Sequence, residues 1–327
     1  MRSFRTTLGF VQRRLTPALV CVALITSVGC QDLRDTVNNK LYKPVTDTGW
    51  ETDSAFLKNS PSVLFRIYHR AGKSFVMPIG ALGPSGMRDL HMTQRGWRAL
   101  DINMLYAGNK LLPVRNGQVA GTISTERGMW EDPMHPVDSI KGCPTVIPTA
   151  EVNTDSGLTL ALTNYKAPAG QLLDASALAN AISEVPQLVA PTMGISGAEL
   201  SHYERFVHQI AHAEGPPSIL LEYHDLTPVV DTGVTQGVRP KHLIIVLDKG
   251  IYGYRATWRY QTTGMSKDKP ALHYLDAVDT NADGVPELFF SIDFVGGRTM
   301  TSMYKQWNET WRETWLRDLM RCDLSQY

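Results

Sequence analysis

The stretch from Asp279 to Glu287 constrains the fold more than any other, because it forces a sharp reversal between two apolar runs. Acidic or amide side chains occupy its first, third, fifth and ninth positions, and Gly284 stands where the backbone must turn. The runs on either side, 271–275 and 288–292, are rich in Leu, Tyr, Phe and Ile. This pattern predicts a strand–turn–strand unit with an oxygen-rich tip, here called the acidic turn.

Oxygen ligands at this spacing suit a hard cation such as Ca²⁺, and three carboxylates so close together repel one another without a counter-ion. An EF-hand would need a bidentate acid at the twelfth position, where this chain has Phe290, so that kind of site is excluded. We therefore expect a structural Ca²⁺; a metal-free Asn/Asp/Gly turn is the alternative. The expected ligands are the side chains of Asp279, Asn281, Asp283 and Glu287 and the carbonyl of Val285.

The acidic turn resembles the D-x-[DN]-x-D-G-x-x-[DE] turn of FG-GAP, integrin-type repeats. The resemblance is confined to this one hairpin and implies Ca²⁺ bound between two strands. Integrin-type propellers carry several copies of the turn, whereas this chain carries one, so we do not expect a propeller.

The N-terminus has the architecture of a secretory signal peptide over residues 1–29. Arginines precede an apolar run at 18–25, which is far shorter than the roughly 20 residues needed to cross a bilayer, and small residues lead to Cys30. The segment resembles a bacterial lipoprotein signal, which implies that Cys30 is acylated and anchors the chain in a lipid bilayer. Ser27 departs from the leucine usual in that family, and an ordinary cleavage site that leaves a secreted or periplasmic protein is the alternative.

Gln31 resembles the residue that sorts such lipoproteins to the outer membrane, facing the periplasm or the cell surface. Residues 30–54 are polar and aperiodic and are expected to form a tether. The rest is divided into 55–190 and 191–327, which together could make one domain. Because 32 basic and 32 acidic residues balance and form no basic block, a nucleic-acid partner is excluded.

Two cysteines, Cys143 and Cys322, remain after Cys30 is acylated. In an oxidising envelope compartment they are the natural disulfide pair, with two separate buried thiols as the alternative. The bridge would contribute on the order of 2–5 kcal/mol.

The pattern along the chain predicts an α+β, strand-rich fold of antiparallel sheets with two or three helices. Hairpins are expected at Gly72 and at Asn116-Gly117, and strands at 158–163, 218–223, 242–247 and 252–258. Helices are expected at 172–189 and, after a capping box at Ser196, up to about Ala213. The four-residue spacing of Trp307, Trp311 and Trp315 predicts a C-terminal amphipathic helix.

No catalytic constellation stands out. Glu204, His208 and His212 would share one face of the predicted helix, but Gln209 stands where a metalloprotease needs its general base. Ser85 and Ser196 lack the second glycine of a nucleophile elbow. Glu222 and His224 alternate on one strand face with Asp225 and Asp231 nearby, and solvated strand-edge residues are the favoured interpretation.

These observations favour a cell-envelope lipoprotein that acts as a calcium-stabilised binding or scaffold module, with an envelope protein or a glycan as its ligand. The alternative is a secreted hydrolase that acts on glycans or peptides through carboxylates or histidines that the sequence does not single out.

Overall fold

The structure, a computed structural model, describes residues 62–70, 72–83, 86–90, 100–128, 149–154, 157–183, 189–225, 241–263, 271–293 and 299–318. They belong to one compact unit, Glu51–Tyr327, that is distinct from Met1–Trp50. Cys30, Cys143 and Cys322 lie outside the described residues, as do the leader and the tether, so the predictions for them stay predictions. No helix within the described ranges is long and apolar enough to cross a membrane.

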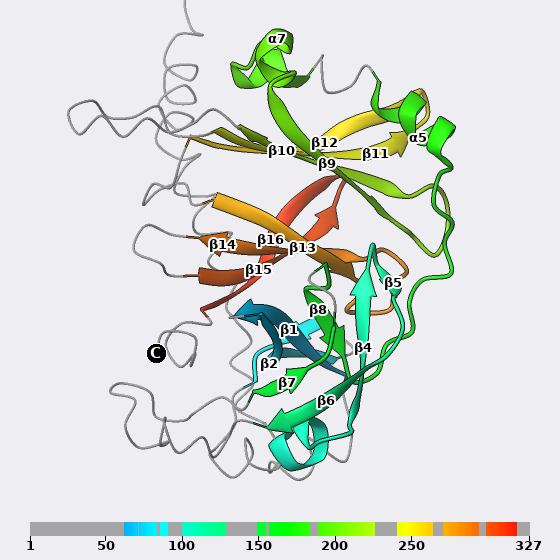
Figure 1. Ribbon diagram of the computed structural model, residues 1–327. Helices are drawn as coiled ribbons and strands as arrows, with labels where there is room; N and C mark the ends of the chain where they lie inside the picture. Colours follow the sequence, from blue (N-terminus) through cyan, green and yellow to red (C-terminus); the bar gives the residue numbers. More distant parts are fainter. Residues whose placement is uncertain are drawn as a thin grey trace, which may run out of the picture. The chain divides into compact units, whose positions relative to one another are not determined.

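The N-terminal half forms a first sheet that closes on itself, because β1 pairs with both β8 and β2 (Figure 1). Asn116 and Gly117 have φ values of 56° and 76° in the turn between β4 and β5, which confirms the predicted hairpin. The hairpin at Gly72 is confirmed by the antiparallel pairing of β1 and β2. The elements are β1 (Val63–Arg70), β2 (Lys73–Gly83), β3 (Gly86–Arg88), a π-helix η1 (Asp101–Leu105), β4 (Lys110–Arg115), β5 (Gln118–Val119), β6 (Ile123–Gly128), β7 (Ala150–Val152) and β8 (Leu160–Leu162).

A second sheet of four antiparallel strands follows three short helices. Its order is β12-β11-β10-β9, and one of its faces packs against the helices through Leu221, Leu243 and Ile245. Asp174 caps the first helix by accepting a hydrogen bond of 2.8 Å from the N–H of Ala177. The elements are α5 (Ala175–Ile182), the 3₁₀ helix η3 (Ala190–Met193), α7 (Gly197–Leu200), β9 (Tyr203–Ile210), β10 (Ser218–Asp225), β11 (Lys241–Gly250) and β12 (Gly253–Thr263).

The third sheet is an antiparallel meander of β13 (Ala271–Val278), β14 (Glu287–Asp293), β15 (Thr299–Trp307) and β16 (Thr310–Asp318). It packs on the free face of the second sheet, where Leu220, Ile244 and Val246 meet Phe290 and Trp311 in one buried cluster. This apolar layer between the second and third sheets, here called the inter-sheet layer, matters because polar groups are buried at both of its ends.

The third sheet also contacts the first sheet. The Arg66 guanidinium donates to the hydroxyl of Ser291 at 3.0 Å, and the N–H of Gly117 donates to Oδ1 of Asp276 at 3.0 Å. Leu275 is the extra residue of a bulge in β13, opposite β14, and its carbonyl accepts a hydrogen bond of 2.7 Å from the hydroxyl of Thr159. The α+β, strand-rich, antiparallel fold class is confirmed.

The prediction of a long helix from Ser196 to about Ala213 is wrong. Ser196 does cap a helix, with the N–H of Glu199 donating to its hydroxyl at 3.0 Å, but α7 ends at Leu200. The residues that follow form β9, which pairs with β10 along its whole length. A strand with Tyr203, Phe206, Val207 and Ile210 gains more from this pairing and packing than the local cap gives to a helix.

The predicted C-terminal amphipathic helix is also wrong in the described part of the chain. Trp307 ends β15, Asn308 and Glu309 form a turn with φ values of 47° and 62°, and Trp311 and Trp315 lie in β16. A spacing of four residues is a multiple of the strand period of two, so it fits a strand as well as a helix. The extra residue Thr314, opposite the step between Met303 and Tyr304, then separates the two tryptophans of β16: the buried Trp311 enters the inter-sheet layer, and the half-buried Trp315 contacts Phe289 and Asp89.

Candidate metal centre

The acidic turn lies between β13 and β14, as predicted, and most of its polar side chains hold the backbone. The N–H groups of Asp283 and Gly284 donate to the carboxylate of Asp279 at 3.1 and 2.9 Å, and the N–H of Val285 donates to Oδ1 of Asp283 at 3.0 Å. The amide of Asn281 donates to Oδ2 of Asp283 at 2.8 Å. Gly284 has a φ of 85°, and a Cβ there would lie 2.6 Å from the Cβ of Ala213, so a larger residue does not fit.

Lys305 of β15 reaches into the acidic turn. Its Nζ lies 2.9 Å from Oδ2 of Asp283 and 3.1 Å from Oε1 of Glu287, whose other oxygen accepts from the N–H and hydroxyl of Thr280. Burial alone would lower the pKa of Lys305, but the two carboxylates outweigh it and raise that pKa. The chain thus supplies one counter-ion to the turn itself. The predicted Ca²⁺ stays a prediction, and it would have to displace this ammonium group.

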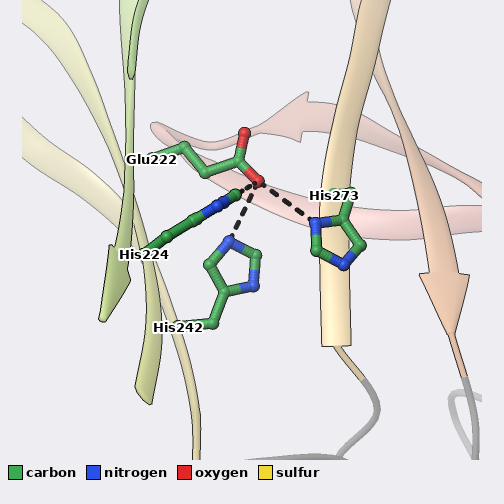
Figure 2. Close-up of side chains that lie close together, drawn as sticks. All are labelled: Glu222, His224, His242 and His273. Atoms are coloured by element: carbon green, nitrogen blue, oxygen red, sulfur yellow. Dashed lines mark hydrogen bonds and ion pairs between the residues drawn. The ribbon is translucent and has the colours of Figure 1, made fainter. Parts of the chain in front are cut away.

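A second group of ligand-type side chains lies at one end of the inter-sheet layer (Figure 2). Glu222 and His224 alternate on β10, His242 stands opposite His224 in the register of β11, and His273 reaches across from β13. One ligand atom of each lies within 4.8 Å of every other. Among the described residues this is the one set of three or more His, Cys, Asp or Glu side chains gathered so closely. We call it the histidine–glutamate cluster.

The three imidazoles all approach the same carboxylate oxygen, Oε1 of Glu222. Nε2 of His242 lies 2.9 Å from it, Nε2 of His224 lies 3.0 Å from it, and Nδ1 of His273 lies 3.7 Å from it. The His242 and His273 rings stack with centroids 5.1 Å apart, and the His224 ring meets the His242 ring edge-on at 4.6 Å. One oxygen therefore stands at the centre of three nitrogens from two different sheets.

The electrostatics favour a carboxylate surrounded by neutral imidazole. Burial by itself raises the pKa of Glu222, but hydrogen bonds from His224 and His242, together with the nearby His273, outweigh it and hold that pKa well below its usual range. Burial lowers the pKa of His242, although Glu222 opposes the shift. At neutral pH the cluster thus presents an anionic oxygen and at least one neutral imidazole, which is the protonation state that binds a metal ion.

A third polar group, the Asp248 cluster, lies at the other end of the inter-sheet layer. The carboxylate of Asp248 accepts hydrogen bonds from the hydroxyls of Ser218 and Thr257, from the amide of Gln306 at 3.0 Å and from the indole of Trp311 at 3.1 Å. Nε2 of His212 lies 2.8 Å from the Ser218 hydroxyl.

The order of these contacts is not that of a Ser-His-Asp triad. In a triad the acid orients the imidazole, whereas here Asp248 contacts the serine itself. Ser218 is also 1% exposed, so a substrate carbonyl does not reach it. The Asp248 cluster is therefore a structural network that joins the second and third sheets.

The predicted trio of Glu204, His208 and His212 is not brought together. His208 packs its ring on Tyr274 at 4.7 Å, and His212 contacts Ser218. Glu204 lies opposite His224 in the pairing of β9 with β10.

The alternation of Glu222 and His224 on one strand is confirmed, but their interpretation as solvated strand-edge residues is wrong for Glu222, which is 5% exposed on an inner strand of its sheet. Its partners are His242 and His273 rather than Asp225 or Asp231. Asp231 lies outside the described residues. Because His242 and His273 come from other strands, only the strand pairing could have pointed to them.

The geometry matches what metal sites require: ligand atoms from rigid strands, a buried anion at the centre and imidazoles from two sheets. No family model, no curated protein and no solved structure matches this chain, so its function is inferred from the site alone.

Proposed function

We propose that this chain binds one divalent transition-metal ion through Oε1 of Glu222, Nε2 of His224, Nε2 of His242 and Nδ1 of His273. The observation that carries the proposal is the convergence of these four atoms within 4.8 Å of one another. Because Oε1 stands between the three nitrogens, it has to move outward to leave room for an ion at their centre. Bonds to such ions are about 2.0–2.2 Å long, so neighbouring ligand atoms lie about 3–3.5 Å apart around a four- or five-coordinate ion.

A metal ion explains the arrangement better than hydrogen bonding alone. A carboxylate oxygen offers two lone pairs, yet three imidazole nitrogens face it, and His273 at 3.7 Å is too far to donate to it. Around an ion each nitrogen would instead use its own lone pair. The four side chains then have equivalent roles.

The ligand types indicate the class of ion. Imidazole suits zinc, copper, nickel and iron, whereas Ca²⁺ and Mg²⁺ prefer oxygen ligands. The histidine–glutamate cluster is therefore proposed for a borderline ion such as Zn²⁺, and it is chemically distinct from the calcium predicted for the acidic turn.

The proposed setting is the cell envelope, with the metal-binding body tethered by an acylated Cys30. The support for this is the signal architecture of the first thirty residues. Cell fractionation tests it: Cys30→Ala is expected to release the protein from membranes, and continued membrane association of this variant would contradict the anchor.

The metal site is tested on the mature protein after treatment with a chelator. Isothermal titration with Zn²⁺ is expected to show one site in the wild type. Glu222→Gln keeps the shape of the side chain and removes its charge, so its affinity should fall at least about 10- to 100-fold, the loss that even an outer-sphere partner causes.

His202→Ala is the matched control, because His202 is an exposed histidine outside the cluster. Its zinc affinity should equal that of the wild type. Absence of a stoichiometric site, or equal affinities for the wild type and Glu222→Gln, would refute the proposal.

A further inference from the structure

We infer that the ion held by the histidine–glutamate cluster keeps a solvent-facing fifth coordination position, beyond its four protein ligands, that takes a small anionic ligand. The inference rests on the proposed function and concerns what the bound ion can do. It distinguishes a site that only holds two sheets together from one that binds an exogenous molecule.

The first support is the unequal exposure of the four ligands. The side chains of Glu222 and His242 are 7% and 9% exposed, whereas those of His224 and His273 are 33% and 43% exposed. An ion between them is bordered by protein on the side of Glu222 and His242. On the side of His224 and His273 it is close to solvent.

The second support is the position of the cluster at the end of the inter-sheet layer. Leu220 and Ile244 lie two residues from Glu222 and His242, and Leu272 precedes His273; all three belong to the inter-sheet layer and are at most 1% exposed. They close the inner side of the site. The remaining direction leads outward past His224 and His273, and Phe206, whose ring lies 5.1 Å from the His224 ring, is itself partly exposed there.

The third support is the charge of the loaded site. Three neutral imidazoles and one carboxylate contribute a single negative charge, so a divalent ion leaves a net charge of +1 at a partly buried position. Such a site favours an anion over a neutral ligand, since the interaction is weakly screened away from bulk water. We therefore expect the exogenous ligand to be a small oxyanion, with a carboxylate or phosphate oxygen on the metal.

An open coordination position on the ion would also supply a catalytic group for the alternative prediction, a secreted hydrolase, for which the sequence singled out none. A metal-bound water at an open position has its pKa lowered to about 7 on zinc in enzymes, and it then serves as a nucleophile. A closed site with four protein ligands and no solvent access is structural. Anion binding is thus the property that separates the two classes.

The test uses cobalt as a coloured probe and azide as the anion. The mature wild-type protein is loaded with one equivalent of Co²⁺, and its visible spectrum is recorded while sodium azide is added. We expect the bands to shift saturably at one azide per cobalt, and phosphate or acetate to compete with azide. The cobalt content after gel filtration shows whether the ion has stayed in the protein.

The outcomes separate the two proposals. Stoichiometric cobalt with a spectrum that azide leaves unchanged would mean a coordinatively closed site, and the present inference would fall while the proposed function stood. No cobalt binding would remove both. His202→Ala should repeat the wild-type titration.

His273→Ala gives an independent check, because it removes the most exposed ligand and should open a further position on the ion. Added imidazole should restore the wild-type cobalt spectrum in this variant, and azide should then bind as before. If azide instead shifted the variant but not the wild type, the wild-type site would have no open position.

Discussion

Glu222 and Asp248 lie at opposite ends of the inter-sheet layer, and both are surrounded by side chains of the second and third sheets. Asp248 meets two hydroxyls, an amide and an indole, all of which bring a hydrogen and none of which is a good ligand for a metal ion. Glu222 meets three imidazoles, which can bring either a hydrogen or a lone pair. The partners of a carboxylate, rather than its burial, thus indicate whether it holds a fold together or binds a ligand.

The difference also concerns reversibility. Every partner of Asp248 donates a hydrogen to it, so this network forms on folding and needs no ligand. The imidazoles around Glu222 can exchange a hydrogen bond for a bond to a metal ion. We therefore expect this end of the inter-sheet layer to have a metal-free and a metal-bound state. We expect substitutions at the Asp248 end to change stability in every condition. Substitutions at the Glu222 end should also change the stability that bound metal adds.

The largest effect is expected for Asp248→Ala. It leaves four donors without their acceptor, two of them on Ser218 and Trp311, which are at most 2% exposed. The free energy of unfolding should fall by about 3–5 kcal/mol, as when a buried charged partner is lost. Urea unfolding at pH 7 measures this loss. Zinc affinity should stay unchanged in the fraction that folds, and a loss below about 1 kcal/mol would show that the network is dispensable.

Asp276 provides a third case, a buried carboxylate whose donors include the backbone N–H groups of Gly117 and Ala277. Burial raises its pKa from 3.8 to about 6. The folded protein therefore binds this proton more tightly than the unfolded chain does, so the group costs stability as the pH rises from about 4 to about 6.

Asp276→Asn keeps an acceptor for both backbone groups and removes the titration. The stability difference between variant and wild type should shift by about 3 kcal/mol in favour of the variant between pH 3 and pH 8. Measuring both proteins at both pH values cancels the other titrating groups. An identical difference at the two pH values would contradict a raised pKa.

The metal-dependent effect is expected to be slightly smaller. Zinc at 100 times its dissociation constant should raise the unfolding free energy of the wild type by about 2.7 kcal/mol. Glu222→Gln should lose most of this gain, and because each protein is compared in zinc and in chelator, any stability that the variant loses without metal does not affect the comparison. Thermal unfolding with zinc and with chelator measures both gains, and an equal gain in the two proteins would place the zinc elsewhere.

The smallest effect is expected for Lys305→Gln in the acidic turn. Without calcium the variant should be destabilised by about 1 kcal/mol, since Asp283 and Glu287 lose a partly exposed ion pair. With calcium the variant should recover more stability than the wild type gains, because no ammonium group competes with the ion.

Lys249→Gln is the control for this experiment, because Lys249 lies over the ring of Tyr254 and not in the acidic turn. Thermal midpoints in calcium and in EGTA measure the effect. A larger calcium gain in the wild type than in Lys305→Gln would show that Lys305 does not oppose the ion.

Local signals in the sequence were sufficient where one short segment decides the structure. Asn116-Gly117 and Gly284 require positive φ, and the turns lie there. The capping box at Ser196 also formed, but its helix was cut short by the pairing of β9 with β10, a contact that no local pattern contains. The tryptophan spacing was misread because a four-residue repeat does not separate a helix from a strand.

The histidine–glutamate cluster shows the same limit. Glu222 and His224 are two residues apart, and their alternation on a strand was visible in the sequence. His242 joins them only through the register of β10 with β11, and His273 only through the packing of the third sheet on the second. Sites assembled across sheets need the tertiary structure before their members can be grouped.

The bulge at Leu275 has a consequence for insertions and deletions in this hairpin. It reverses the alternation of β13, so that Leu272, Tyr274 and Ala277 face the inter-sheet layer while Asp276 turns to Gly117 of the first sheet. Deleting one residue here would place the carboxylate of Asp276 in the apolar inter-sheet layer. This would destabilise the fold more than most substitutions at the same position. Among homologues of this chain, the number of residues between His273 and Asp279 should therefore vary less than the identities of those residues.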